Sequence, residues 1–170
     1  MTDQVQGFDH FVGACGPALL RFAYLLTGNR SLAEDLVQDA LIKAHRRWSV
    51  HGRVDFPEAY VRRIVVNEFL SWRRRRASRE VVGPVPEQAH RDEFQPLVER
   101  DAVWRVLAEL PRRQRSVLVL RYYEAMPDGE IAMLLGCAEG TVRSLATRAF
   151  ATLRCDSRLG PHLDSVAVRE

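Results

Sequence analysis

Two acidic residues four positions apart, Asp35 and Asp39, are the first side chains in this sequence whose type and spacing could do chemistry. Paired carboxylates can act as a general acid and base or help to hold a metal ion. Neither role is supported, because no histidine or metal-ligand cluster accompanies the pair. The sequence also has no nucleophile constellation and no phosphate-binding loop. It therefore predicts a protein that is not an enzyme and that uses no metal and no other cofactor.

Arginine is the second chemically distinctive residue type. All but one of the 25 basic residues are arginine, and a GC-rich genome explains this as well as a need for phosphate contacts does. The local clustering of arginines is more informative than their total number. Arg73, Arg74, Arg75 and Arg76 form a run of like charges that repel one another unless they are solvated or matched to a polyanion.

The composition places the 170-residue chain among ordinary soluble proteins. Hydrophobic residues make up 46% and charged residues 28%, which excludes a wholly disordered or low-complexity chain. No apolar run approaches the roughly 18 residues of a membrane span, and residues 1–7 lack the features of a signal peptide. Three scattered cysteines argue against a disulfide framework and a zinc site. We expect a cytoplasmic protein whose cysteines are buried as small hydrophobes.

Basic and acidic residues are unevenly distributed along the chain. Residues 1–78 hold 12 basic and 8 acidic side chains, residues 102–155 hold 8 and 5, and residues 79–101 hold 3 and 6. The acidic middle segment is rich in proline over residues 80–96, which is typical of a linker. Both flanks have helical periodicity. The sequence predicts an all-α fold of two small helical domains, residues 1–78 and 102–155, joined by a flexible acidic linker (79–101) and followed by a tail (156–170).

The acidic pair lies on a predicted helix with two different faces. Ser31 and Glu34 form a capping box, so we expect this helix to begin there and to run to about Trp48. The stripe expected in the core consists of Ala33, Val37, Ala40, Leu41, Ala44 and Trp48. The stripe expected to face outward consists of Asp35, Gln38, Asp39, Ile42 and Arg46.

Prolines, glycines and caps set the neighbouring boundaries. Gly16-Pro17 predicts a kink or a restart in the first helix, and Gly28 predicts its end. A polar loop is expected over residues 49–54. Asp55 as an N-cap, Pro57 at the helix start and Glu58 in the first turn together predict a helix that continues into the arginine run.

The second domain has a helix-turn-helix pattern. Helices are expected over residues 103–110 and about 112–124, followed by two short helices separated by Leu135–Ala138, with Gly136 as a left-handed C-cap. The core stripe of the last helix consists of Val142, Ala146, Ala149 and Leu153.

The opposite face of that last helix is small and polar. It consists of Gly140, Ser144, Thr147 and Ala151, flanked by Arg143 and Arg148. Such a face can enter a DNA major groove, where the arginines reach guanine edges or phosphates. The alternative is a solvated face on a three-helix bundle.

Three segments in order, residues 23–48, 57–76 and 107–154, resemble the extracytoplasmic-function (ECF) RNA polymerase sigma factors of the sigma-70 family. Within that family, the chain is similar to the SigE-like actinobacterial group. The resemblance implies a factor that binds core RNA polymerase and directs promoter-specific transcription initiation. It also implies promoter DNA as a partner, and it admits an anti-sigma factor as a further one.

The resemblance also implies a role for each polar face. The stripe at Asp35, Gln38, Asp39 and Ile42 would dock on the clamp helices of the largest polymerase subunit. The minus-10 element would be melted and read by the loop before Asp55 and by Arg62, Arg63, Asn67, Arg73, Arg74, Arg75 and Arg76. The minus-35 element would be read by Thr141, Arg143, Ser144, Thr147 and Arg148. Tyr60 and Trp72 would either stack on bases or belong to the core.

Three positions depart from the family pattern, and two other functions compete with it. Pro127 and Ala138 stand where the family often has serine caps, and Leu145 stands where a basic or amide residue is frequent. Pro127 as the first helical residue, with Asp128 behind it, would compensate for one lost cap.

A stand-alone helix-turn-helix regulator would explain the second domain but not the acidic stripe. A protein-interaction module that sequesters another sigma or anti-sigma factor would barely touch DNA.

Overall fold

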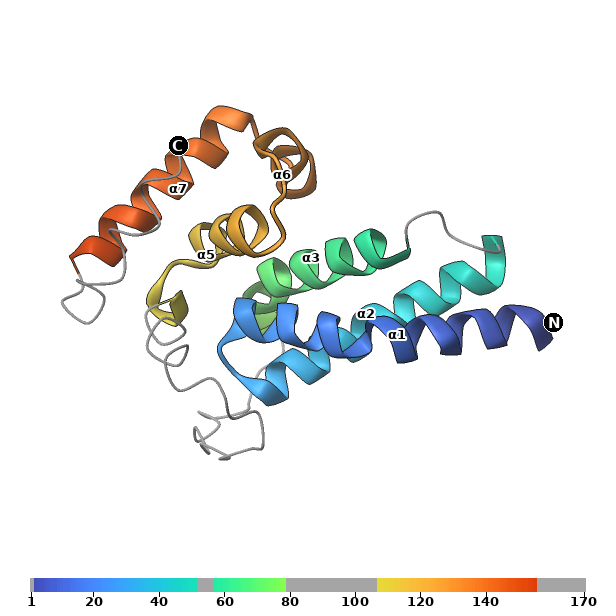
Figure 1. Cartoon of the computed structure of the whole chain (residues 1–170). Helices are drawn as coiled ribbons and strands as arrows, with labels where there is room; N and C mark the ends of the chain where they lie inside the picture. Colours follow the sequence, from blue (N-terminus) through green and yellow to red (C-terminus); the bar gives the residue numbers. More distant parts are fainter. Residues whose placement is uncertain (1, 52–56, 79–106, 156–170) are drawn as a thin grey trace.

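The computed structural model describes residues 2–51, 57–78 and 107–155, and these residues contain helices and no strand (Figure 1). The all-α prediction is confirmed. The predicted linker, the tail and the start of the helix expected at residues 103–110 lie outside the described residues. The elements are α1 (Thr2–Thr27), α2 (Arg30–His51), α3 (Pro57–Ser78), α5 (Arg112–Leu118), the π-helical segment η1 (Val119–Tyr123), α6 (Asp128–Leu135) and α7 (Glu139–Arg154).

Helix α1 runs without interruption through Pro17, so the predicted restart there is wrong. Proline removes one backbone hydrogen bond, to the carbonyl of Gly13. Gly13 and Pro17 both lie on the exposed side of α1, where water can bond to that carbonyl. Gly28 ends the helix as predicted, with a φ of 67° and its N–H donating to the Tyr24 carbonyl at 2.8 Å.

The start of α2 differs from the predicted capping box. The side-chain oxygen Oδ1 of Asn29 accepts a hydrogen bond from the backbone N–H of Leu32 at 2.9 Å, which makes Asn29 the N-cap. Ser31 lies inside the helix. Glu34 pairs with Arg30 at 2.8 Å, one turn earlier, instead of bonding back to the cap. The capping-box prediction was wrong because a better acceptor stands two residues before Ser31.

We expect the two candidate caps to respond differently to alanine. Asn29→Ala should lower the free energy of unfolding by about 1 kcal/mol, because it leaves helix N–H groups without an acceptor. Ser31→Ala should change it by less than about 0.5 kcal/mol, because Ser31 is an exposed helical position. Urea unfolding followed by circular dichroism measures both. Equal losses for the two variants would contradict the assignment of Asn29 as the cap.

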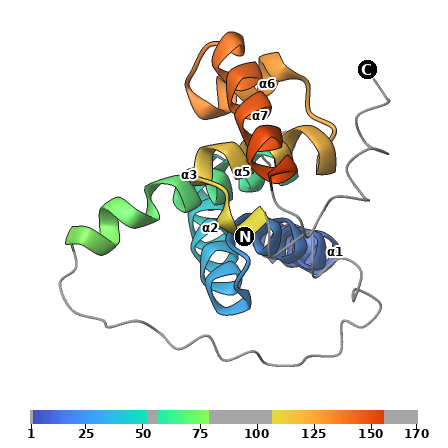
Figure 2. The same ribbon diagram turned by 90° about the vertical axis from the view of Figure 1, so that its left-hand side faces the viewer.

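Helix α2 extends to His51, so the predicted loop does not include residues 49–51. The remainder of that loop and Asp55 lie outside the described residues. Helix α3 begins at Pro57, as predicted, and continues through the arginine run. Its C-terminal end projects away from the other helices (Figure 2).

Helices α1, α2 and α3 pack as a three-helix bundle. Its fully buried side chains include Leu19, Phe22 and Leu26 of α1 and Val65 of α3. The predicted core stripe of α2 is buried except for Leu41, which is half-buried, and the sequence pattern missed buried Leu36. Lys43 of α2 also forms an ion pair with Glu68 of α3.

The second bundle contains α5, η1, α6 and α7, and it has the predicted helix-turn-helix geometry. Gly136 ends α6 with φ 61° and ψ 46°, as expected of a left-handed C-cap. All four predicted core residues of α7 are buried. Pro127 and Ala138 are the N-caps of α6 and α7, and neither forms a side-chain capping bond. Pro127 is thus not the first helical residue, and Asp128 instead pairs with Arg121 at 3.2 Å.

The two bundles pack against each other, which the sequence did not predict. Because both predicted domains are basic, we expect them to gain little by touching and to move independently. In the structure α5 contacts α1 and α3 (Figure 1). The buried apolar residues of both bundles form one cluster. The expectation of little contact is wrong, because hydrogen bonds from arginines to backbone carbonyls, described below, bring the bundles together despite their like charge.

Candidate functional sites

The outward face of α2 is exposed as predicted. Asp35, Gln38 and Asp39 are all exposed, and Ile42 among them keeps 45% of its surface accessible. An apolar side chain surrounded by polar ones is typical of the centre of a protein interface. We call Asp35, Gln38, Asp39 and Ile42 the α2 face.

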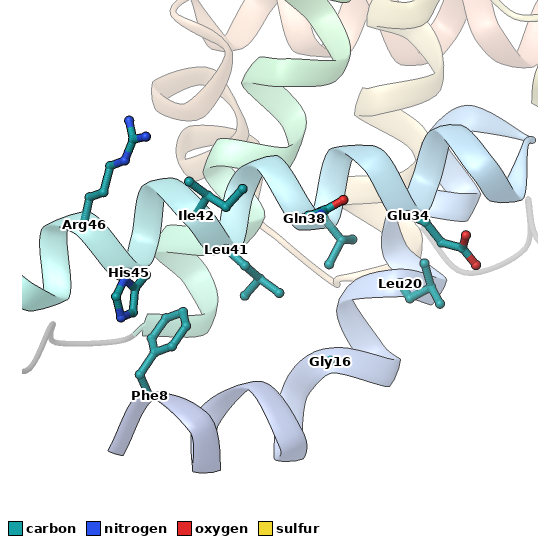
Figure 3. A pocket seen from close by; sticks show the side chains of 10 residues that line it. Phe8, Gly16, Leu20, Glu34, Gln38, Leu41, Ile42, His45 and Arg46 are labelled. Atoms are coloured by element: carbon teal, nitrogen blue, oxygen red, sulfur yellow. The ribbon is translucent and has the colours of Figure 1, made fainter. Parts of the chain in front are cut away.

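A groove of about 610 Å³ lies beside the α2 face, between α1 and α2. Leu41 and His45 of α2 point toward α1 (Figure 3), and the His45 ring meets the Phe8 ring edge-on with centroids 5.0 Å apart. Gln38 and Ile42 belong to both the groove and the α2 face. Sequence periodicity missed the groove because it shows which face of a helix is apolar but not how far apart two helices lie.

Helix α3 presents two of the predicted minus-10 residues to solvent. Arg63 and Asn67 are exposed and lie one helical turn apart, on the same side of α3. The arginines at positions 73–76 belong to the same helix, but their side chains lie outside the described residues. Tyr60 is half-buried against the core, with the Arg47 guanidinium 5.4 Å from its ring centroid. The side chain of Trp72 is not described.

Arg62 differs from its neighbours because acidic residues hold it on two sides. Glu58, one turn earlier on α3, accepts a hydrogen bond from Arg62 at 2.8 Å. Glu124, which follows η1 in the second bundle, forms an ion pair with the same guanidinium. Only 24% of the Arg62 side chain and 6% of the Glu124 side chain are exposed. Burial raises the pKa of Glu124, although the Arg62 charge acts to lower it.

Two further arginines connect the bundles. Arg112 donates to the backbone carbonyl of Phe69 at 2.8 Å, and Arg115 donates to that of Leu26 at 2.7 Å. Arg115 is buried without a carboxylate partner among the described residues, and burial lowers its pKa to about 10, which leaves it charged at neutral pH. Its position on the apolar stripe of α5, before Leu118 and Val119, is the sequence signal that could have identified it.

Helix α7 presents the predicted minus-35 residues on one exposed surface. These are Thr141, Arg143, Ser144, Thr147 and Arg148. The hydroxyls of Ser144 and Thr147 donate to the carbonyls of Gly140 and Arg143 at 2.9 and 3.0 Å. Their oxygens keep lone pairs that can accept hydrogen bonds from a ligand. Leu145, the departure noted above, is half-buried and packs on the core.

Some exposed and half-buried side chains were not predicted. Tyr122, Tyr123 and Met133 of the second bundle are exposed, and the Tyr122 ring meets Phe150 edge-on. The cysteines are free thiols, but Cys155 is exposed while Cys15 and Cys137 are half-buried, so the expectation of buried cysteines was wrong. No group of three or more potential metal ligands occurs among the residues that the structure describes.

The chain matches two family models in the same order as the bundles. Residues 11–79 match sigma-70 region 2, and residues 100–153 match sigma-70 region 4. It is 37% identical to an RNA polymerase sigma-E factor of Streptomyces coelicolor over 152 residues, covering 89% of this chain and 86% of that protein. The chain is an ECF RNA polymerase sigma factor. It is also 35% identical to the ECF sigma factor SigL of Mycobacterium tuberculosis, covering 80% of each chain.

Solved structures support the assignment of this chain to the same family. The sigma factor RpoE of Bartonella quintana, in complex with the anti-sigma factor NepR, matches with a TM-score of 0.62 and 29% identity, covering 88% of this chain and 95% of that one. CnrH, in complex with the cytosolic domain of CnrY, matches with a TM-score of 0.59 and 26% identity, covering 88% and 86%. The family assignment makes this chain a promoter-specific initiation factor that works with RNA polymerase. None of the helices that the structure describes is long and apolar enough to cross a membrane.

Proposed function

We propose that this sigma factor divides its work among three exposed faces. Residues 1–78 form the domain that docks on polymerase and reads the minus-10 element, and residues 102–155 form the domain that reads the minus-35 element. Residues 79–101 link the two, and residues 156–170 are a tail. The observation that carries the proposal is that the α2 face and the predicted minus-35 residues of α7 are both solvent-exposed, on separate bundles.

The α2 face docks on the clamp helices of the largest polymerase subunit. Support comes from its composition, since two carboxylates and an amide surround exposed Ile42. The acidic charge attracts a basic partner and sets the register, while Ile42 gains from burial.

Helix α3 captures the melted minus-10 strand. Asn67 offers both a donor and an acceptor to the edge of an extruded base, and Arg63 and the arginine run track phosphates. The chain acts without catalysing a bond change itself, and it acts in the cytoplasm, where polymerase works. An anti-sigma factor is a further partner, as RpoE has in its complex with NepR.

Run-off transcription with purified core polymerase tests the proposal. The chain should direct initiation from a promoter selected with the same holoenzyme, whereas core alone should not. A stand-alone regulator or a sequestering module would bind DNA or protein without producing a transcript.

Asn67→Ala should separate polymerase binding from promoter melting. Asn67 is exposed on α3, so the variant should fold and bind core as the wild type does. It should lose minus-10 discrimination, because charge alone does not read a base edge. Permanganate reactivity of promoter thymines measures the open region. Unchanged reactivity would remove Asn67 from the site.

A further inference from the structure

Helix α7 begins with an acidic side chain that the proposed minus-35 reading does not use. Glu139 is the first residue of α7 and its only acid, whereas Arg143, Arg148 and Arg154 are its basic residues. The Glu139 side chain is exposed. A carboxylate on a helix that enters a DNA groove is repelled by the phosphates of every sequence alike. Either a specific donor on the DNA or a structural role in the protein must offset that repulsion.

The contacts of Glu139 give it little structural role. A glutamate four positions before an arginine in a helix commonly pairs with it, but Glu139 forms no ion pair with Arg143 in the part of the chain that the structure describes. Its carboxylate lies instead against the first turn of α6, where a Cβ on Gly129 would come within 3.2 Å of Glu139 Oε1. That turn already contains Asp128 and Glu130, so a third acid gains little from the positive end of the α6 dipole. Among the described residues Glu139 therefore remains an acceptor without a hydrogen-bond partner.

Glu139 stands where a recognition helix meets bases. In a helix-turn-helix the N-terminal residues of the second helix contact base edges, while the first helix crosses the backbone. Glu139 and Arg143 are one helical turn apart, or about 6 Å along the axis, which is less than two base-pair steps of ~3.4 Å. The two side chains can therefore reach base pairs that are close neighbours in the duplex.

The chemistry of a carboxylate restricts the base that it can read. An ionised carboxylate only accepts hydrogen bonds, whereas an arginine only donates them. In the major groove the base donors are the amino groups of cytosine and adenine. Adenine also presents the acceptor N7 beside its amino group, which repels a carboxylate, whereas cytosine presents the N4 amino group alone. A carboxylate is thus matched to cytosine.

We propose that Glu139 is a specificity-determining residue of α7, whose carboxylate accepts a hydrogen bond from the N4 amino group of a cytosine in the minus-35 element. This role rests on the proposed minus-35 function of α7. The acid favours one base by a hydrogen bond and disfavours all other sequences by repulsion. The cytosine lies within two base pairs of the pair that Arg143 contacts.

The test uses the full-length chain bound to core polymerase and promoter duplexes that differ singly at each minus-35 base pair. Competition binding at one salt concentration gives the relative affinities. Glu139→Ala removes the acceptor, and Glu139→Gln replaces it by an amide that can bind adenine at N6 and N7. Glu130→Ala is the matched control, because it removes one exposed acidic charge from the neighbouring helix α6. Circular dichroism checks that every variant folds.

The wild type should prefer cytosine at one position by about tenfold, which is the lower end of base discrimination by a good hydrogen-bonded contact. Glu139→Ala should lose that preference and bind the three disfavoured sequences more tightly than the wild type does. Glu139→Gln should move the preference to adenine. Glu130→Ala should change all affinities by one common factor. A structural role alone predicts that the alanine and glutamine variants of Glu139 behave alike, and that result would overturn the proposal.

A cytosine analogue isolates the amino group. Replacing the cytosine by a pyrimidinone that lacks this group should weaken wild-type binding about tenfold and leave Glu139→Ala unaffected. Equal losses for the two proteins would contradict the contact, and so would a change by one common factor on all sequences for Glu139→Ala. Arg143→Ala separates the two proposals. If it relaxes one base pair while Glu139→Ala relaxes none, only the role of Glu139 is wrong, whereas a wild-type holoenzyme indifferent to every minus-35 substitution would overturn both.

Discussion

Reversing both charges of the α2 face, with Asp35→Arg and Asp39→Arg together, is expected to abolish co-purification of this sigma factor with core RNA polymerase. Each side chain is exposed and so contributes little to folding, but it would be desolvated against a partner in the docked complex. Losing one partner of a buried charge pair costs about 2–5 kcal/mol, and a reversal adds repulsion. The summed cost of two such changes corresponds to a loss of affinity of about 1000-fold or more.

A matched control separates the face from the net charge. Asp9→Arg with Glu130→Arg makes the same change in charge at two exposed positions that belong neither to the α2 face nor to the lining of the groove beside it. The control should bind core as the wild type does, and both double variants should have wild-type circular dichroism. If Asp35→Arg with Asp39→Arg still co-purifies at native affinity, the polymerase docks elsewhere on the chain.

The second large effect is expected on helix α7, where base reading and phosphate anchoring should separate. Arg143 lies in the second turn of a helix that begins at Glu139, where a recognition helix meets base edges. Arg148 lies more than a turn further on, where backbone contacts are common. Arg143→Ala should therefore cost about 1–3 kcal/mol at one base pair of the minus-35 element. Arg148→Ala should weaken binding to all sequences alike. It should also reduce the steepness of the plot of log affinity against log salt concentration by about 1.

Affinity for a panel of duplexes with single base-pair substitutions, measured at several salt concentrations, distinguishes the two arginines. Both side chains are exposed, so neither change should affect folding. A uniform loss for Arg143→Ala, or no loss for either variant, would show that α7 does not lie in the groove in this register.

Helical periodicity was enough to predict most of the secondary structure and the exposed faces. The outward stripe of α2 and the core stripe of α7 are where the pattern places them, because a period of 3.6 residues is a local property of the chain. Gly28 and Gly136 end their helices as predicted, because a positive φ favours glycine wherever it occurs. Competition between nearby groups was harder to predict. Asn29, rather than Ser31, caps α2, since the two side chains offer acceptors to the same few N–H groups.

The family resemblance added the roles of these faces, which composition and spacing left open. Region 2 and region 4 occur in the expected order, so the helix-turn-helix is one half of a sigma factor rather than a separate regulator. The individual site residues remain predictions that the variants above test.

Only the tertiary structure decided how the two bundles meet. Arg115 and Leu26 are 89 positions apart, and Arg62 and Glu124 are 62 positions apart. No periodicity connects residues at such separations, and the like net charge of the two domains pointed to repulsion. The contact depends instead on individual guanidinium groups that reach carbonyls and a carboxylate of the other bundle, and such pairing depends on where whole helices lie in space. The sequence by itself determined which faces can bind, and the packing of the bundles determined that Arg62 is covered while Arg63 and Asn67 remain exposed.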